Sequence, residues 1–284
     1  MPRLLKKILS EVLTERETSK IYSAFDIIGD VVIIKVPDCL LTKKEVIAKS
    51  ILQHVKSARS VFIQTSSVRG SYRIRNLEFL AGVYNTLTEY REHGCRFRVD
   101  INKTYFSPRL STERLRIAKM VSNDEVITNM FAGVGTYSIV IAKLKKNSKI
   151  YSIDLNPIAN ELCVTNIQLN KVQDRVFPIC GDAREIITNQ IKGKSDRVIM
   201  PLPERAKEFV DSAVLALKDR EGFVHYFAHI SAHTKKLAVE QGMTDTEDAF
   251  RDYQHQILAT RVIREVGPRL YQIVSDVYVN NNDK

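Results

Sequence analysis

The chain has 284 residues, 44% of them hydrophobic, and is long enough to bury one large core or two smaller ones. Basic residues outnumber acidic ones by 43 to 33, and the net charge of +10 favours an anionic partner. The absence of a long apolar run and of a signal-peptide core excludes a membrane span and predicts a soluble, cytoplasmic protein. The four cysteines form no CxxC pair, so neither a metal site nor a disulfide framework is expected.

Short mixed elements are predicted for the first hundred residues. The apolar positions near the N-terminus have helical spacing, which predicts an amphipathic helix. Further along, the patterns predict strands at 31–36, 60–64 and 95–101 and a helix at 43–55. We therefore expect a small α+β domain over residues 1–99.

A regular alternation of strands and helices is predicted from residue 100 onward. A helix at 112–121 comes first, and the strands are expected at 125–129, 149–154, 176–180, 197–200, 222–227, 261–266 and 271–277. Strands separated by helices indicate a mainly parallel sheet. The sequence thus predicts a doubly wound α/β domain with a closing hairpin over residues 100–284.

The ends of the first three of these strands carry residues suited to a nucleoside cofactor. Gly133 and Gly135 follow the first strand and permit close approach of a ligand to the backbone. Asp154 ends the second strand, where an acidic residue commonly binds a ribose hydroxyl pair. Asp182 follows the third strand, where a carboxylate suits an adenine amino group. Taken singly, these features also fit a tight turn and ordinary helix caps.

The spacing of this loop distinguishes between two cofactors. A dinucleotide site requires GxGxxG, whereas Ser138 stands at the third glycine position here. S-adenosylmethionine has one ribose and no phosphate, so the pattern favours it. The complete predicted cofactor set is Asn129, Phe131, Gly133, Gly135, Asp154, Leu155, Asp182, Ala183 and Pro201.

Eight segments, in order, resemble one known family. They are YRIRNLEFLAG, VDINKTYFSPRLSTERLRIAKMV, NMFAGVGTYS, IDLNP, NIQLNKV, GDARE, RVIMPLP and VHYF. The chain resembles the archaeal and eukaryotic tRNA (guanine-N1)-methyltransferases that modify position 37, and their wybutosine-pathway aminocarboxypropyltransferase relatives. The resemblance implies a class I methyltransferase-type, Rossmann-like fold, S-adenosylmethionine as cofactor and the tRNA anticodon stem-loop as partner. Longer members have an extra N-terminal domain, and this chain is expected to begin at the second one.

The resemblance also implies two catalytic residues. Glu113, in the STER segment, matches the family's proton acceptor, and Arg73 matches an arginine that stabilises charge on the guanine. Guanine N1 must lose a proton as it gains a methyl group, so a carboxylate base beside an arginine suits the reaction. From the residues alone, the favoured interpretation is a solvated helix glutamate paired with Arg114 or Arg116 and an arginine packed on the domain surface.

Two positions depart from the family pattern. Asn129 replaces an aspartate that normally begins the glycine motif, and Pro201 replaces an asparagine that holds the guanine edge. Proline offers neither a side-chain amide nor a backbone donor. Methylation of guanosine 37 remains the favoured activity, with aminocarboxypropyl transfer at the same position and an inactive tRNA- or cofactor-binding paralogue as alternatives.

A basic platform is needed to hold a tRNA while its base enters the site. We expect the first domain to position the RNA, and the enzyme to act as a monomer. The predicted RNA-binding residues are Arg69, Arg75, Lys103, Arg109, Arg114 and Arg116. Tyr105 and Phe106 suit a stacking face or the core, and His225 and Tyr226 suit the methionine pocket or the core.

Overall fold

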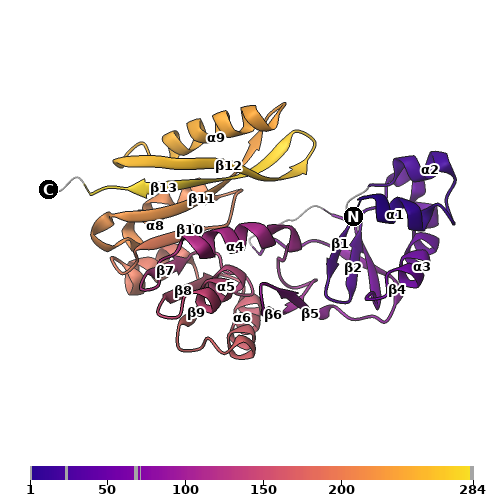
Figure 1. Ribbon diagram of the computed structural model, residues 1–284, viewed down its shortest axis with the longest axis horizontal. Coiled ribbons are helices and arrows are strands. Elements are labelled where there is room, and N and C mark those ends of the chain that lie inside the picture. Colours follow the sequence, from indigo (N-terminus) through magenta and orange to yellow (C-terminus); the bar gives the residue numbers. More distant parts are fainter. Residues whose placement is uncertain (1, 23–24, 67–69, 71, 282–284) are drawn as a thin grey trace. The chain divides into compact units, whose positions relative to one another are not determined.

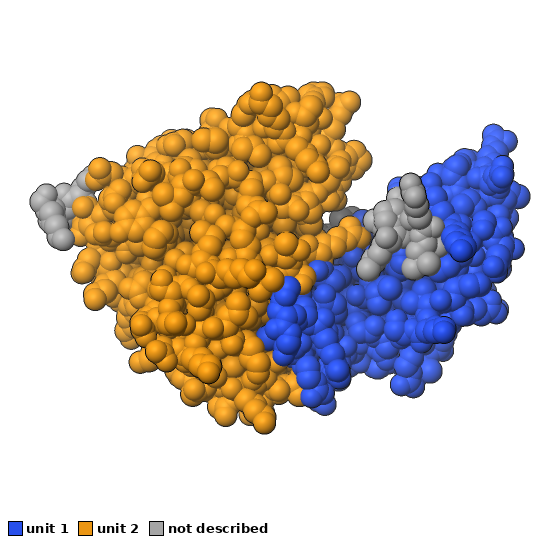
Figure 2. All heavy atoms as spheres, viewed as in Figure 1, with its two compact units in different colours: residues 1–108 blue, residues 109–284 orange. Residues whose placement is uncertain are grey.

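The computed structural model describes residues 2–22, 25–66, 70 and 72–281 (Figure 1). The chain divides into two compact units, residues 1–108 and 109–284 (Figure 2). The division falls nine residues after the position expected from the sequence. The turn at 101–108 follows the last strand of the first unit, whereas the helix that begins at Ser111 belongs to the second.

The first unit is an α+β fold around a four-stranded sheet. Its helices are α1 (Pro2–Leu9), α2 (Glu15–Lys20) and α3 (Lys44–His54). The sheet has the order β1-β2-β3-β4, and its strands are β1 (Asp26–Ile28), β2 (Val31–Ile34), β3 (Ser60–Gln64) and β4 (Leu77–Gly82). A separate hairpin joins β5 (Leu87–Glu92) to β6 (Cys95–Asp100). Leu9 and Ile51 from two helices pack with Val32 and Val61 of the sheet in one buried cluster.

The second unit is built on a seven-stranded sheet with the order β12-β13-β11-β10-β7-β8-β9. The strands are β7 (Val126–Asn129), β8 (Lys149–Asp154), β9 (Val176–Cys180), β10 (Arg197–Met200), β11 (Gly222–Ser231), β12 (His255–Gly267) and β13 (Leu270–Val279). Strands β7 to β11 are mutually parallel, whereas β13 runs antiparallel to β11 and β12. Because β7 lies between β10 and β8, the strand order reverses there, and ligands of such sheets bind beside this reversal.

Helices cover both faces of the large sheet. They are α4 (Ser111–Met120), α5 (Thr136–Leu144), α6 (Pro157–Asn170), α7 (Ala183–Ile186), α8 (Val210–Ala216) and α9 (Lys235–Ala249). Val224 and Tyr226 of β11 face a buried core that α8 and α9 share. His225 and Phe227 alternate with them and point to the opposite face, where Tyr137 of α5 contacts the Phe227 ring. Among the described residues, no helix is long and apolar enough to span a membrane.

The predicted fold class is confirmed: the second unit is a Rossmann-like α/β fold with a closing hairpin. The strands predicted at 149–154, 176–180 and 197–200 have the observed bounds. Strand β11 extends to Ser231, and the hairpin strands are longer than predicted at both ends. The hairpin lies at the sheet edge, where exposed positions on β12 weaken the apolar signal.

Candidate active site

Loops from neighbouring strands meet at Asp154. Its Oδ2 accepts a hydrogen bond of 2.6 Å from the Gly133 amide, and its Oδ1 accepts one of 2.9 Å from the Asn156 amide. Its backbone carbonyl accepts a hydrogen bond from the amide of Gly181 at 3.0 Å. The loops after β7, β8 and β9 are therefore bonded to one another through a single aspartate.

Gly135 is required by both its backbone and its surroundings. Its φ of +88° lies in the left-handed region, and a Cβ there would lie 2.7 Å from Sγ of Cys163 on α6. Gly135 precedes the first residue of α5, so it sets how the glycine loop enters that helix. Any other residue would adopt a strained backbone conformation and require the Cys163 side chain to shift.

The remaining predicted cofactor residues lie around these strand ends. Asp182 caps α7 by accepting a hydrogen bond from the Arg184 amide at 2.8 Å, and Ala183 is buried behind it. Leu155 is 43% exposed directly after Asp154. Phe131 packs edge-on against Phe209 with 4.9 Å between ring centroids, and Pro201 directly follows β10.

Asn129 lies deeper than a residue in contact with a ligand would be expected to lie. It is fully buried at the end of β7, and its Nδ2 donates to Oγ of Ser138 at 3.1 Å. The Ser138 hydroxyl also accepts from Ser152 at 2.6 Å, which joins β7, β8 and α5. Within the described part of the chain, the buried Oδ1 of Asn129 has no hydrogen-bond partner.

Glu113 lies in the first turn of α4 and is 3% exposed. Its carboxylate accepts hydrogen bonds from Nε of Arg116 at 3.0 Å and from Nη2 at 2.6 Å. Burial raises the pKa of Glu113 above its ordinary value, even though Arg116 and the charge of Arg261 act in the opposite direction. A buried carboxyl group with a raised pKa is suited to accept a proton.

The direction of α4 places Glu113 toward the carboxyl ends of the parallel strands, where the cofactor loops lie. At the other end of the helix, the Met120 carbonyl accepts a hydrogen bond of 3.4 Å from Arg197, the first residue of β10. Arg116, one turn earlier in the helix, bonds to Asp276, whose strand partner His225 lies beside Ile199, nearer the carboxyl end of β10. The helix therefore runs opposite to the parallel strands, with its N-terminal turn toward their carboxyl ends. Glu113 lies about two turns, or roughly 10 Å, from Met120 along the helix axis.

Arg73 belongs to the first unit. Its guanidinium lies over the Tyr105 ring, 4.1 Å from the centroid, and its backbone has a φ of +55°. A left-handed conformation is uncommon for arginine and indicates that the surrounding turn imposes it. Phe106 is buried against Tyr90 and belongs to the core, so it offers no stacking face.

Burial divides the predicted RNA-binding residues. Lys103 and Arg109 are exposed, as a phosphate contact requires. Arg114 is only 2% exposed and Arg116 is held between two carboxylates, so we correct their assignment to an RNA surface. Arg75 is partly buried, with Asp26 at 3.6 Å. Arg69 lies outside the described residues.

His225 and Tyr226 lie within β11 and are both buried, which agrees with a place in the core. Nδ1 of His225 lies 2.6 Å from Asp276 of β13, and the Tyr226 hydroxyl donates to Asp245 of α9. Sequence reasoning missed Asp276 and Arg197. A charged residue inside an apolar strand pattern was the available signal, because such a residue is seldom buried without a partner.

The fold and the site together define a class of protein. A Rossmann-like sheet with a glycine loop at its strand reversal, acidic residues at the next two strand ends and a buried carboxyl group nearby is the arrangement of a class I methyltransferase.

Comparisons with known proteins give the family. The TRM5/TYW2 methyltransferase domain matches residues 88–258, and the TYW2 N-terminal domain matches residues 5–86. The chain belongs to the TRM5/TYW2 family, as the sequence motifs predicted. It is 38% identical to the tRNA (guanine(37)-N(1))-methyltransferase Trm5b of Pyrococcus abyssi, over 91% of this chain and 75% of that protein.

Two further similarities bear on the function. The tRNA 4-demethylwyosine(37)-methyltransferase Taw21 of Saccharolobus solfataricus is 35% identical over 93% of this chain and 97% of that protein. A solved complex of aTrm5 with tRNALeu has a TM-score of 0.82 and 35% identity, covering 96% of this chain and 77% of that one.

Proposed function

We propose that this protein is an S-adenosylmethionine-dependent tRNA methyltransferase that forms 1-methylguanosine at position 37. The observation that carries the proposal is Glu113, a carboxyl group buried in α4 with a raised pKa, on a chain similar to Trm5b over nine-tenths of its length. A base of this kind is what methylation at guanine N1 requires, because N1 carries a proton.

The cofactor fits the residues present at the strand ends. Asp154 is held at the end of β8 by hydrogen bonds from the amides of Gly133 and Asn156, and a carboxylate in this position would accept from the ribose hydroxyl pair. Phe131 and Leu155 would flank the adenosine, and Asp182 would accept from its amino group. When bound, S-adenosylmethionine supplies an electrophilic methyl group on its sulfonium.

The chain's own groups handle the proton and the developing charge. Glu113 accepts the N1 proton as the methyl group is transferred, and Arg73 stabilises negative charge on O6 of the guanine. Arg116 holds the Glu113 carboxylate in place before it is protonated. The exposed Lys103 and Arg109 contact phosphates of the anticodon stem-loop, in a complex of one protein with one tRNA.

A second candidate function is methylation of 4-demethylwyosine at the same position. The observation that favours it is Pro201, which leaves no side-chain amide at the position where the family pattern holds the guanine edge. The similarity to Taw21, which is named as a 4-demethylwyosine methyltransferase, also favours this second function. The same fold and cofactor site serve both reactions, so the acceptor base decides between them.

The test uses pure protein, S-adenosylmethionine and two tRNAs, one with guanosine at position 37 and one with 4-demethylwyosine there. Each RNA is digested to nucleosides and weighed by mass spectrometry. We expect one added methyl group on guanosine. A methyl group only on the tricyclic base would establish the second candidate, and an aminocarboxypropyl group there would assign the transferase reaction. If neither RNA is modified, the protein would be assigned as an inactive paralogue that binds tRNA or the cofactor.

A further inference from the structure

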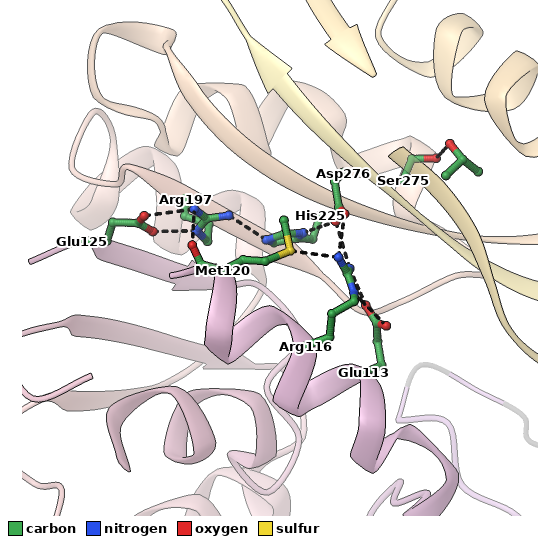
Figure 3. Close-up of polar contacts among 9 residues, drawn as sticks. Glu113, Arg116, Met120, Glu125, Arg197, His225, Ser275 and Asp276 are labelled. Atoms are coloured by element: carbon green, nitrogen blue, oxygen red, sulfur yellow. Dashed lines mark hydrogen bonds and ion pairs between the residues drawn. The ribbon is translucent and has the colours of Figure 1, made fainter. Parts of the chain in front are cut away.

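Six polar side chains form a continuous hydrogen-bonded chain on the sheet face that α4 covers (Figure 3). The order is Glu113, Arg116, Asp276, His225, Arg197 and Glu125. His225 and Asp276 are directly paired across β11 and β13. The proposed reaction uses Glu113 and Arg116, and it leaves Asp276, His225 and Arg197 without a role although all three are buried.

The tautomer of His225 is determined by its neighbours. Arginine has no acceptor atom, so Nη1 of Arg197 donates to Nε2 of His225 over 2.9 Å. The ring proton therefore resides on Nδ1, which donates to Oδ1 of Asp276 over 2.6 Å. Burial lowers the pKa of His225 below 6.5, so the ring is neutral at physiological pH. His225 is a fixed link with one donor and one acceptor.

Asp276 in turn determines where the Arg116 guanidinium lies. Nη1 of Arg116 donates to Oδ2 of Asp276 at 2.6 Å, and Nη2 donates to Oδ1 at 3.0 Å. The same guanidinium donates through Nε and Nη2 to Glu113. One arginine is therefore shared between two carboxylates, both of them nearly inaccessible to solvent.

We propose that Asp276, oriented by His225, is a positioning residue for Glu113: by holding Arg116 it fixes the Glu113 carboxylate and keeps it able to take up a proton. The inference rests on the proposed function, in which Glu113 is the base. An arginine that paired with Glu113 alone would bind its ionised form more tightly and make it a weaker base.

The charges that face Glu113 support this role. Burial raises the pKa of Glu113 most, Arg116 on the same helix and Arg261 on β12 lower it, and Asp276 on β13 raises it. The His225 ring behind Asp276 is neutral and adds no charge. Asp276 itself remains ionised, because His225 and Arg116 outweigh its burial and hold its pKa below the usual range.

The test is Asp276→Asn in the full chain, measured by single-turnover transfer at saturating S-adenosylmethionine across pH. Activity requires ionised Glu113, so the rate falls on the acidic side as this group is protonated. We expect that limb to move to lower pH by about one unit and the plateau rate to fall roughly tenfold. In a Glu113→Gln background, Asp276→Asn should change the rate little.

The matched control is Asp245→Asn, which removes the carboxylate bonded to Tyr226 on the other sheet face and should leave the pH profile unchanged.

A second pair of variants guards against a folding defect in Asp276→Asn. His225→Gln retains an N–H donor and an acceptor oxygen and should behave as the wild type. His225→Leu removes only the group that orients Asp276, so its acidic limb should move in the same direction as in Asp276→Asn, but less far. The proposal would be overturned if the acidic limb of the pH–rate profile stayed in place in both Asp276→Asn and His225→Leu, or moved to higher pH. Equal effects of His225→Gln and His225→Leu would also overturn it.

A measurement without turnover separates this inference from the proposed function. The carboxyl carbon of Glu113, assigned by its loss in Glu113→Gln, is titrated by NMR in wild type and Asp276→Asn. A lower pKa in Asp276→Asn supports the positioning role, and an unchanged one contradicts it. Full activity of Glu113→Gln would instead reject Glu113 as the base and leave the titration result standing.

Discussion

Asp154 accepts a 2.6 Å hydrogen bond from the backbone amide of Gly133, so the end of β8 is tied directly to the glycine loop after β7. The carboxylate thereby fixes the loop at the strand reversal, in addition to any contact with a ribose. This dual role means that loss of Asp154 removes both a ligand contact and the support of the loop.

Asp154→Ala should therefore weaken S-adenosylmethionine binding by at least tenfold, because charged hydrogen bonds contribute about 1.5–3 kcal/mol each. Isothermal titration calorimetry measures the dissociation constant directly. Asp174→Ala, at a side chain that is 69% exposed, serves as the control and should leave the affinity unchanged. Equal affinities for Asp154→Ala and wild type would reject the placement of the cofactor.

Gly135→Ala should destabilise the protein by about 1–3 kcal/mol, since it combines a left-handed φ with overpacking against Cys163. Urea denaturation gives the change in the free energy of unfolding. Gly193→Ala is the matched control, because Gly193 has φ +67° with no atom near a Cβ. Adding Cys163→Ala should recover part of the loss in Gly135→Ala, and strictly additive losses would show that the contact is unimportant.

Glu113→Gln should leave binding of tRNA and cofactor intact and slow transfer by about a hundredfold. In the wild type, the rate should rise with pH as Glu113 loses its proton, and burial places this rise above the ordinary pKa of 4.5. Rapid-quench kinetics over a pH series measures both effects. Glu240→Gln, on an exposed part of α9, should retain the wild-type profile. A full rate in Glu113→Gln would exclude it as the base.

Arg109 and Arg114 should respond differently to removal of their charge. Arg109→Gln removes an exposed guanidinium and should weaken tRNA binding, with a salt dependence reduced by about one unit of slope. Arg114→Gln changes a buried side chain and should mainly lower stability. Filter binding at several salt concentrations and thermal unfolding separate the effects. Arg251→Gln is the exposed control, and a slope change in it equal to that of Arg109→Gln would argue against a specific contact.

The sequence alone determined the large sheet and its cofactor loops. Short segments rich in apolar residues and separated by helical spacing predicted the bounds of β8, β9 and β10, because helices cover both faces of these strands. Glycines and aspartates at the strand ends were recognisable because their spacing along the chain follows from the order of the strands. The ordered motifs also gave the family, which the comparisons confirm.

Only the tertiary structure decided which charged residues are buried and with what partners. The spacing of α4 shows that Arg114 and Arg116 lie on a helix, but not that one is buried and the other is held by Asp276, 160 residues away. Asp276, His225 and Arg197 come together because β13, β11 and β10 are neighbours in the sheet and side chains alternate between its faces. A charged residue in an apolar strand indicates that a partner exists, but the identity of the partner depends on strand order and register, which are properties of the folded sheet.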